Sequence, residues 1–172
     1  MSKYHIHDLV ELKEILFHDF QIINKMRSPE PNKIKLLSTL FSINPNSWRV
    51  VGISSDALEI FEKNGFKKKS GMRINRSHIT QRFSFYKSLL EKNTDIEDSE
   101  TFWNLYYEND MTILASASEN MSYDQSIFEN AYVVPQDERK LFQTSGYAWK
   151  HQDEEEEFLK DLFKLHLAKK QN

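Results

Sequence analysis

The chain has 172 residues, of which 39% are hydrophobic and 13% aromatic, so it carries enough apolar surface for a packed core. Only four Gly and four Pro are present, which disfavours an all-β fold with many tight turns; we expect an α+β, helix-rich single domain with a small sheet. The absence of Cys excludes disulfides and thiolate zinc sites, and the net charge of −3 argues against a general nucleic-acid binder.

The N-terminal part predicts two helices separated by an interruption. Apolar residues recur at helical spacing over residues 7–25, which predicts an amphipathic helix. The proline-containing segment 28–32 is expected to break the chain, and a second helix is expected over residues 33–42. The N-terminus does not read as a secretory signal, and no apolar run is long enough to cross a bilayer. We therefore expect a cytoplasmic protein without a membrane partner.

The next part predicts a strand, a helix and a second extended segment. The run "WRVVGIS" is short, apolar and rich in β-branched residues, as in a buried strand. "SDALEIFEKNG" predicts a helix whose N-cap is Ser54, Ser55 or Asp56. Gly65 is expected to end this helix as its C′ residue. The segment 72–79, "MRINRSHI", shows an extended pattern.

Helices are expected over residues 83–92 and 100–108, with Asp98 or Ser99 as the N-cap of the second one. "MTILAS", residues 111–116, predicts another strand.

A helix start follows that strand directly. Ser116 and Glu119 stand at the spacing of a capping box, which places Asn120 in the first full turn of a helix.

The C-terminal part predicts one more strand and a long helix. The strand is expected over residues 127–134, followed by a short helix over 137–143 and an extended segment over 147–149. Residues 153–169 predict a helix with acidic residues in its first turns and lysines in its last, as the helix dipole favours.

Positive charge is concentrated in one segment. The twenty residues from 63 to 82 contain seven basic residues and no acidic one, whereas the rest of the chain is strongly acidic. Those basic residues are Lys63, Lys67, Lys68, Lys69, Arg73, Arg76 and Arg82. A local positive field on an acidic body is what a polyanion-binding site needs, while a solvated basic loop is equally compatible with this pattern.

The order of elements in residues 73–122 resembles the core of the HNH, or ββα-metal, endonucleases. An extended segment ends in "RSHI", a strand "MTILAS" follows, and a helix then carries Asn120. The resemblance implies that His78 is the general base and that Asn120 is the principal ligand of a divalent metal, Mg²⁺ or Mn²⁺. A carboxylate must complete such a site, and Asp110 and Asp124 are the nearest candidates in sequence.

The same resemblance assigns roles to the basic residues. Arg76 and Arg82 flank His78 and could hold phosphate oxygens, so that Arg82 would act with His78 in catalysis. Contacts to the DNA backbone further out would come from Lys67, Lys68, Lys69 and Arg73. DNA is thus the expected partner, and the oligomeric state, a homodimer included, stays open.

These inferences divide the chain into three segments of one domain. Residues 71–125 would form the nuclease core, residues 1–70 a helical scaffold with one strand, and residues 126–172 a C-terminal strand and helix. The expected function is metal-dependent hydrolysis of DNA, of the restriction or phage type by analogy.

Two other interpretations remain. Ser77 stands where the endonucleases commonly have an acidic residue before the His, which favours a non-catalytic nucleic-acid-binding or regulatory protein with a degenerate site. The acidic remainder of the chain favours an interaction protein that binds no nucleic acid. A His between Ser and Ile is also typical of a structural or surface position.

Overall fold

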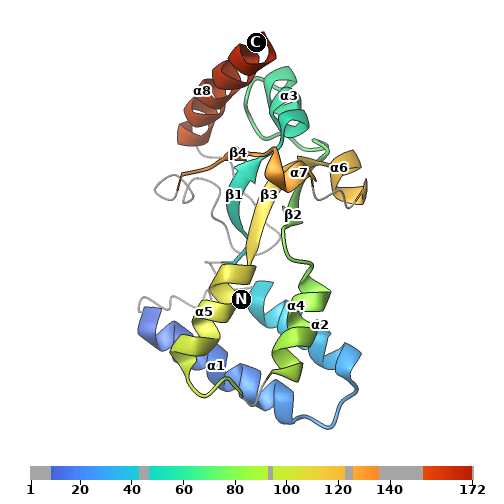
Figure 1. Ribbon diagram of the computed structural model, residues 1–172, viewed down its shortest axis with the longest axis vertical. Helices are drawn as coiled ribbons and strands as arrows, with labels where there is room; N and C mark the ends of the chain where they lie inside the picture. The colour runs from blue at the N-terminus through green and yellow to red at the C-terminus, as the bar shows by residue number, and fades with distance from the viewer. Residues whose placement is uncertain (1–8, 43–46, 93–94, 123–125, 136–152, 172) are drawn as a thin grey trace. The chain divides into compact units, whose positions relative to one another are not determined.

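The computed structural model describes residues 9–42, 47–92, 95–122, 126–135 and 153–171 (Figure 1). These residues are mostly helical and include a small mixed sheet, which confirms the expected α+β class. None of the helices within these ranges combines the length and the apolar character that a bilayer span requires.

The chain forms two compact units, each built from two separate stretches of sequence. The first unit comprises residues 1–43 and 80–110, and the second comprises residues 44–79 and 111–172. The segment 71–125 is therefore shared. Its two central helices belong to the first unit, and its strands belong to the second.

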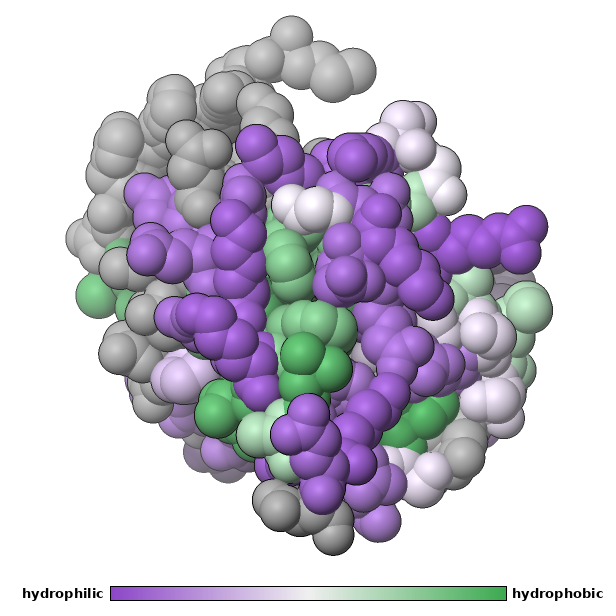
Figure 2. Space-filling model, turned by 90° about the horizontal axis from the view of Figure 1, so that it is seen from above, coloured by the Kyte–Doolittle hydropathy of each residue, from purple (hydrophilic) through white to green (hydrophobic). Residues whose placement is uncertain are grey.

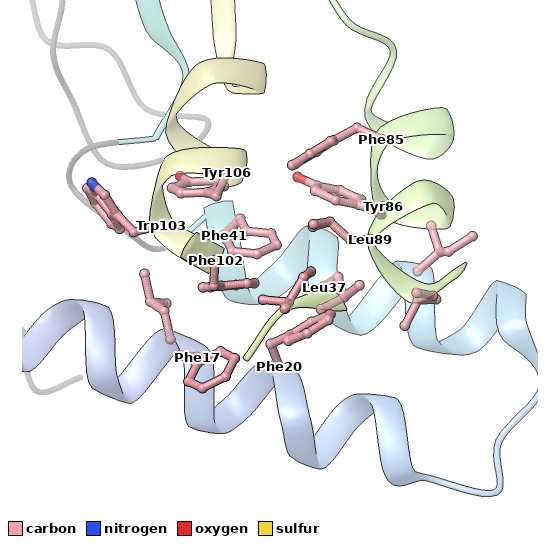
Figure 3. Packing of buried hydrophobic residues seen from close by; sticks show 14 of the residues in the cluster. Phe17, Phe20, Leu37, Phe41, Phe85, Tyr86, Leu89, Phe102, Trp103 and Tyr106 are labelled. Carbon is pink, nitrogen blue, oxygen red and sulfur yellow. The ribbon is translucent and has the colours of Figure 1, made fainter. Parts of the chain in front are cut away.

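The described helices of the first unit pack around a shared aromatic core. They are α1 (Leu9–Lys25), α2 (Glu30–Ser42), α4 (Arg82–Glu91) and α5 (Ser99–Asn109). Figure 3 shows rings from α1, α2, α4 and α5 turned toward one another. Phe41 stacks on Tyr106 with ring centroids 4.3 Å apart, and Phe20 stacks on Phe102 at 4.9 Å. Burial of these large side chains is what stabilises the helix faces.

The boundaries of these helices follow local chemistry, with one correction. Asp98 is the N-cap of α5, as predicted, and its carboxylate accepts a 2.7 Å hydrogen bond from the backbone N–H of Thr101. Helix α2 begins at Glu30, so the expected interruption over residues 28–32 is wrong in its second half. Pro31 is tolerated there because the first N–H groups of a helix have no intrahelical acceptor.

The described strands of the second unit form one mixed sheet in the order β2-β3-β1-β4. Strand β1 is parallel to β3, whereas the β2–β3 and β1–β4 pairs are antiparallel. The strands are β1 (Arg49–Ile53), β2 (Ile74–His78), β3 (Met111–Ser116) and β4 (Tyr132–Val133). The helices are α3 (Ser55–Lys63), α6 (Ala117–Ser122), α7 (Ser126–Glu129) and α8 (Asp153–Lys170).

Helices α3 and α8 lie side by side and share a core with the sheet (Figure 1). The core residue Phe61 of α3 is fully buried, as is Leu159 of α8. Helix α3 begins after the N-cap Ser54, whose hydroxyl accepts from the Ala57 N–H at 3.1 Å. It ends before Gly65, whose φ of 69° confirms the predicted C′ position.

The strand expected over residues 127–134 is wrong in its first half. Helix α7 covers Ser126–Glu129, and only Tyr132 and Val133 pair with β1. The helical turn closes because the backbone N–H and the side-chain amide of Asn130 both donate to the Ser126 carbonyl, at 3.0 and 2.8 Å. Such local bonds compete with a strand ladder. The elements expected over 137–143 and 147–149 lie outside the described residues.

Candidate functional site

His78 is the last residue of β2 and lies opposite Thr112 of β3. Its ring meets the indole of Trp48 edge-on, with centroids 5.2 Å apart at 81°. Both ring nitrogens are shielded from solvent. Trp48 adopts a φ of 58°, which is rare for a bulky side chain and indicates that the surrounding fold holds it there. The residue is half-buried, but the two nitrogens that would accept a proton do not contact solvent, whereas a general base has to reach water.

Asn120 lies in α6, beyond the other end of the β2–β3 ladder. In β3, Thr112 lies opposite His78 and Ser116 lies opposite Ile74. Helix α6 starts at the residue after Ser116. His78 lies four positions after Ile74 along the strand, roughly 13 Å away at the usual rise per residue. The structure thus brings the two strands of the expected hairpin together, but it places the His and the helix start at opposite ends of that hairpin.

The expected supporting residues of the metal site belong elsewhere. Asp110 is buried in the first unit and accepts a 3.0 Å hydrogen bond from the Tyr106 hydroxyl. Arg82 is the first residue of α4 and donates to the Ser38 hydroxyl at 3.4 Å, also in the first unit. Asp124 lies outside the described residues. In the described part of the chain, no group of three or more His, Cys, Asp or Glu residues is arranged to hold a metal ion.

The predicted capping box is present at the start of α6. The Ser116 N–H donates to the Glu119 carboxylate at 2.7 Å, and the Glu119 N–H donates to the Ser116 hydroxyl at 3.2 Å. The same carboxylate oxygen accepts from the Ser54 hydroxyl at 2.7 Å, a contact that the sequence did not reveal. The only hint in the sequence is a serine at the carboxyl end of each of the two β-rich runs: Ser54 directly follows β1 and Ser116 is the last residue of β3, and the two strands are parallel neighbours. Glu119 therefore serves as a structural tie between helix starts.

The basic residues of the second unit follow α3 and continue onto β2. Lys67, Lys68 and Lys69 are exposed between α3 and β2, and Arg73 immediately precedes the strand. Arg76 lies within β2 and is partly exposed. In the described sheet, β2 is an edge strand. We refer to Lys67, Lys68, Lys69, Arg73 and Arg76 together as the basic face.

Charges on the basic face act on one another. Burial lowers the pKa of the Lys68 ammonium, although the residue as a whole remains exposed, and the positive charge of Arg76 lowers it further. The carboxylate of Glu155 in α8 acts in the opposite direction on Lys68. Lys67 pairs with Glu156 of the same helix at 3.3 Å. The face thus combines like charges held close together with partial neutralisation by α8.

Residues expected to act together therefore fall into separate groups. The lysines and the two arginines before His78 belong to the second unit, whereas Arg82 and Asp110 belong to the first unit. Comparison of the chain with protein-family models, with curated proteins and with solved structures finds no match.

Proposed function

We propose that the protein binds nucleic acid through the basic face of the second unit and does not cleave it there. The observation that supports this most directly is the run of exposed lysines, Lys67 to Lys69, just before the edge strand β2, which carries Arg76. A phosphate group bound near Lys68 and Arg76 would offset the repulsion between their charges by attracting both of them. Affinity gained in this way depends on the phosphate backbone and carries little sequence information.

The arrangement of the arginines supports the same function. A guanidinium offers a planar fork of donors that matches phosphate oxygens. Arg73 immediately precedes the edge strand β2, and Arg76 lies in the middle of it. The acidic remainder of the chain repels polyanions, so binding at this face is expected to be local and strongly dependent on salt.

Charge reversal tests the proposal. Changing Lys67, Lys68 and Lys69 to Glu should weaken binding of a short DNA duplex and flatten the plot of log K against log salt by about 0.9 for each phosphate that the protein no longer neutralises. A matched control reverses Lys35, Lys87 and Lys92, which are exposed in the first unit, and changes the net charge by the same amount. Equal reductions in affinity in both variants would refute a specific role of the basic face.

Metal-dependent DNA hydrolysis is a second candidate. The element order favours it, since β2 and β3 are antiparallel and are followed by α6 with Asn120. This mechanism requires the His78 imidazole to reach a water and a carboxylate to join Asn120 at the metal. The shielded ring nitrogens of His78 and its distance along the β2–β3 ladder from the start of α6 favour binding without cleavage instead.

A nicking assay separates the two candidates. Supercoiled plasmid is incubated with the protein and Mg²⁺ or Mn²⁺, beside His78→Ala and Asn120→Ala. Nicking by the wild type that both variants lose supports hydrolysis. Salt-sensitive binding without nicking supports the binding function, and the absence of both supports an interaction protein that binds no nucleic acid.

A further inference from the structure

We propose that the acidic start of α8 regulates the basic face by occupying it, so that Glu156, with Glu155 beside it, competes with the phosphates of a nucleic acid for Lys67 and Lys68. This inference rests on the proposed function. It assigns a role in binding to carboxylates that otherwise belong to an ordinary helix start.

The ion pair between Lys67 and Glu156 is the contact by which α8 occupies the basic face. The Lys67 ammonium lies 3.3 Å from one carboxylate oxygen of Glu156, and the Lys160 ammonium lies 2.6 Å from the other. These two lysines hold the pKa of Glu156 below its usual range, with the Lys160 bond the larger cause. The carboxylate therefore stays ionised and stands where a phosphate oxygen would contact Lys67.

Glu155 acts electrostatically on the next lysine of the basic face, Lys68. Its side chain is buried, and its negative charge favours the charged form of Lys68 against the combined effect of burial and Arg76. A phosphate bound at Lys68 would act in the same way. The neighbouring carboxylates of α8 thus act on neighbouring lysines of the basic face, much as successive phosphates of a strand would.

Helix α8 is held firmly enough for this contact to belong to the fold. Leu159 and Leu162, one and two turns after the acidic residues, are buried against α3 and the sheet. Near the other end, the Tyr132 hydroxyl and His166 Nδ1 lie 3.0 Å apart, and Lys170 donates to Glu59. In Figure 2 a strip of hydrophobic side chains runs between two bands of hydrophilic ones.

Because α8 is held in place, we expect Glu156 to weaken the binding of nucleic acid at Lys67 without preventing it. A nucleic acid that contacts Lys67 has to displace one exposed ion pair, and such pairs contribute about 0–1 kcal/mol. The protein should therefore bind more weakly and with a shallower salt dependence than its lysines alone would give, and removal of the competing carboxylate should restore one phosphate contact.

The test compares Glu156→Gln with Asp161→Asn. Both changes remove one negative charge from α8, but Asp161 pairs with Lys164 at 2.7 Å. Duplex DNA binding is measured at several salt concentrations. Glu156→Gln should bind about 2- to 5-fold more tightly, as expected for release of one exposed pair, with a log–log salt slope steeper by about 0.9. Asp161→Asn should leave the slope unchanged.

A double-mutant cycle with Lys67→Ala locates the effect. In the Lys67→Ala background, Glu156→Gln should no longer raise the affinity or the salt slope, because the competed lysine is absent. A persistent gain, or equal gains from Glu156→Gln and Asp161→Asn, would overturn the competition. If neither the wild type nor Glu156→Gln binds duplex at low salt, the proposed function itself fails. Circular dichroism confirms that each variant is folded.

Discussion

The Ser54 hydroxyl donates a 2.7 Å hydrogen bond to the Glu119 carboxylate, across 65 positions of sequence. The same oxygen accepts the Ser116 N–H at 2.7 Å, so one side chain joins the N-cap of α3 to the start of α6. This is possible because β1 and β3 are parallel neighbours, and the helices that follow them begin at the same end of the sheet. The positive ends of both helices favour a carboxylate there.

Replacement of Glu119 should test this tie. Glu119→Ala removes the acceptor for both serines and should lower the free energy of unfolding by about 1–2 kcal/mol, as for the loss of other helix caps. Glu119→Gln keeps an amide oxygen that can accept the same bonds and should lose less than half as much. Urea unfolding measures both, and equal losses would show that charge rather than hydrogen bonding holds the helix starts.

Gly52 in β1 is expected to tolerate no side chain. A Cβ there would lie 3.1 Å from Ile113 Cγ2, 3.2 Å from Ala131 Cβ and 3.3 Å from the Tyr132 carbonyl oxygen. Gly52→Ala should therefore destabilise the protein by about 1–3 kcal/mol through overpacking.

Gly65→Ala gives the comparison for Gly52→Ala. Nothing lies within 4 Å of the added Cβ, but a φ of 69° is unfavourable for Ala, so the free energy of unfolding should fall by about 1 kcal/mol. Thermal unfolding ranks the two variants, and a larger effect at Gly65 would contradict the close packing around β1.

Phe41 should be a main determinant of stability in the first unit. Its ring is fully buried and stacks on Tyr106 at 4.3 Å and on Tyr86 at 5.4 Å (Figure 3). Phe41→Ala should cost about 3–5 kcal/mol in unfolding free energy, since it leaves a cavity among aromatic rings. Leu36→Ala, on the same helix but 41% exposed, should cost under about 0.5 kcal/mol. Similar losses in chemical denaturation would argue against this core.

The Asp98 cap predicts a pH dependence of stability. Hydrogen bonds from the Thr101 backbone N–H, and then from its hydroxyl, hold the pKa of Asp98 below its usual value in the folded state. A lowered folded-state pKa stabilises the protein above the unfolded-state pKa, and this contribution is lost as the pH falls through the folded-state pKa. Asp98→Asn keeps a capping oxygen without the charge, so its deficit relative to wild type should shrink as the pH falls below about 4.

Asp19→Asn serves as the control for Asp98→Asn. Asp19 is an exposed carboxylate of α1 in the same unit, and its replacement removes the same charge. A pH-dependent deficit of equal size in Asp19→Asn would show that net charge, and not the cap, causes the effect. Chemical denaturation at several pH values provides the measurement.

Features that depend on a few consecutive residues were determined by the sequence itself. The cap at Asp98, the left-handed Gly65 and the box of Ser116 and Glu119 all occur where they were predicted, because each satisfies backbone groups within a few positions. The bounds of β3 also follow from the sequence, since a buried apolar run ends directly at that box. The prediction of a strand over residues 127–134 was wrong in its first half, because Asn130 forms a local hydrogen bond that closes a helical turn there.

Only the tertiary structure decided which distant residues meet. The alternation that predicts an extended segment over residues 72–79 does not say that His78 pairs with Thr112, and it is this register that separates His78 from Asn120. Likewise, no local pattern joins Lys67 to Glu156 or Ser54 to Glu119. Such contacts require the closure of long loops, which costs conformational entropy. The favourable free energy that offsets this cost comes from packing of the whole sheet and its helices rather than from the residues that touch.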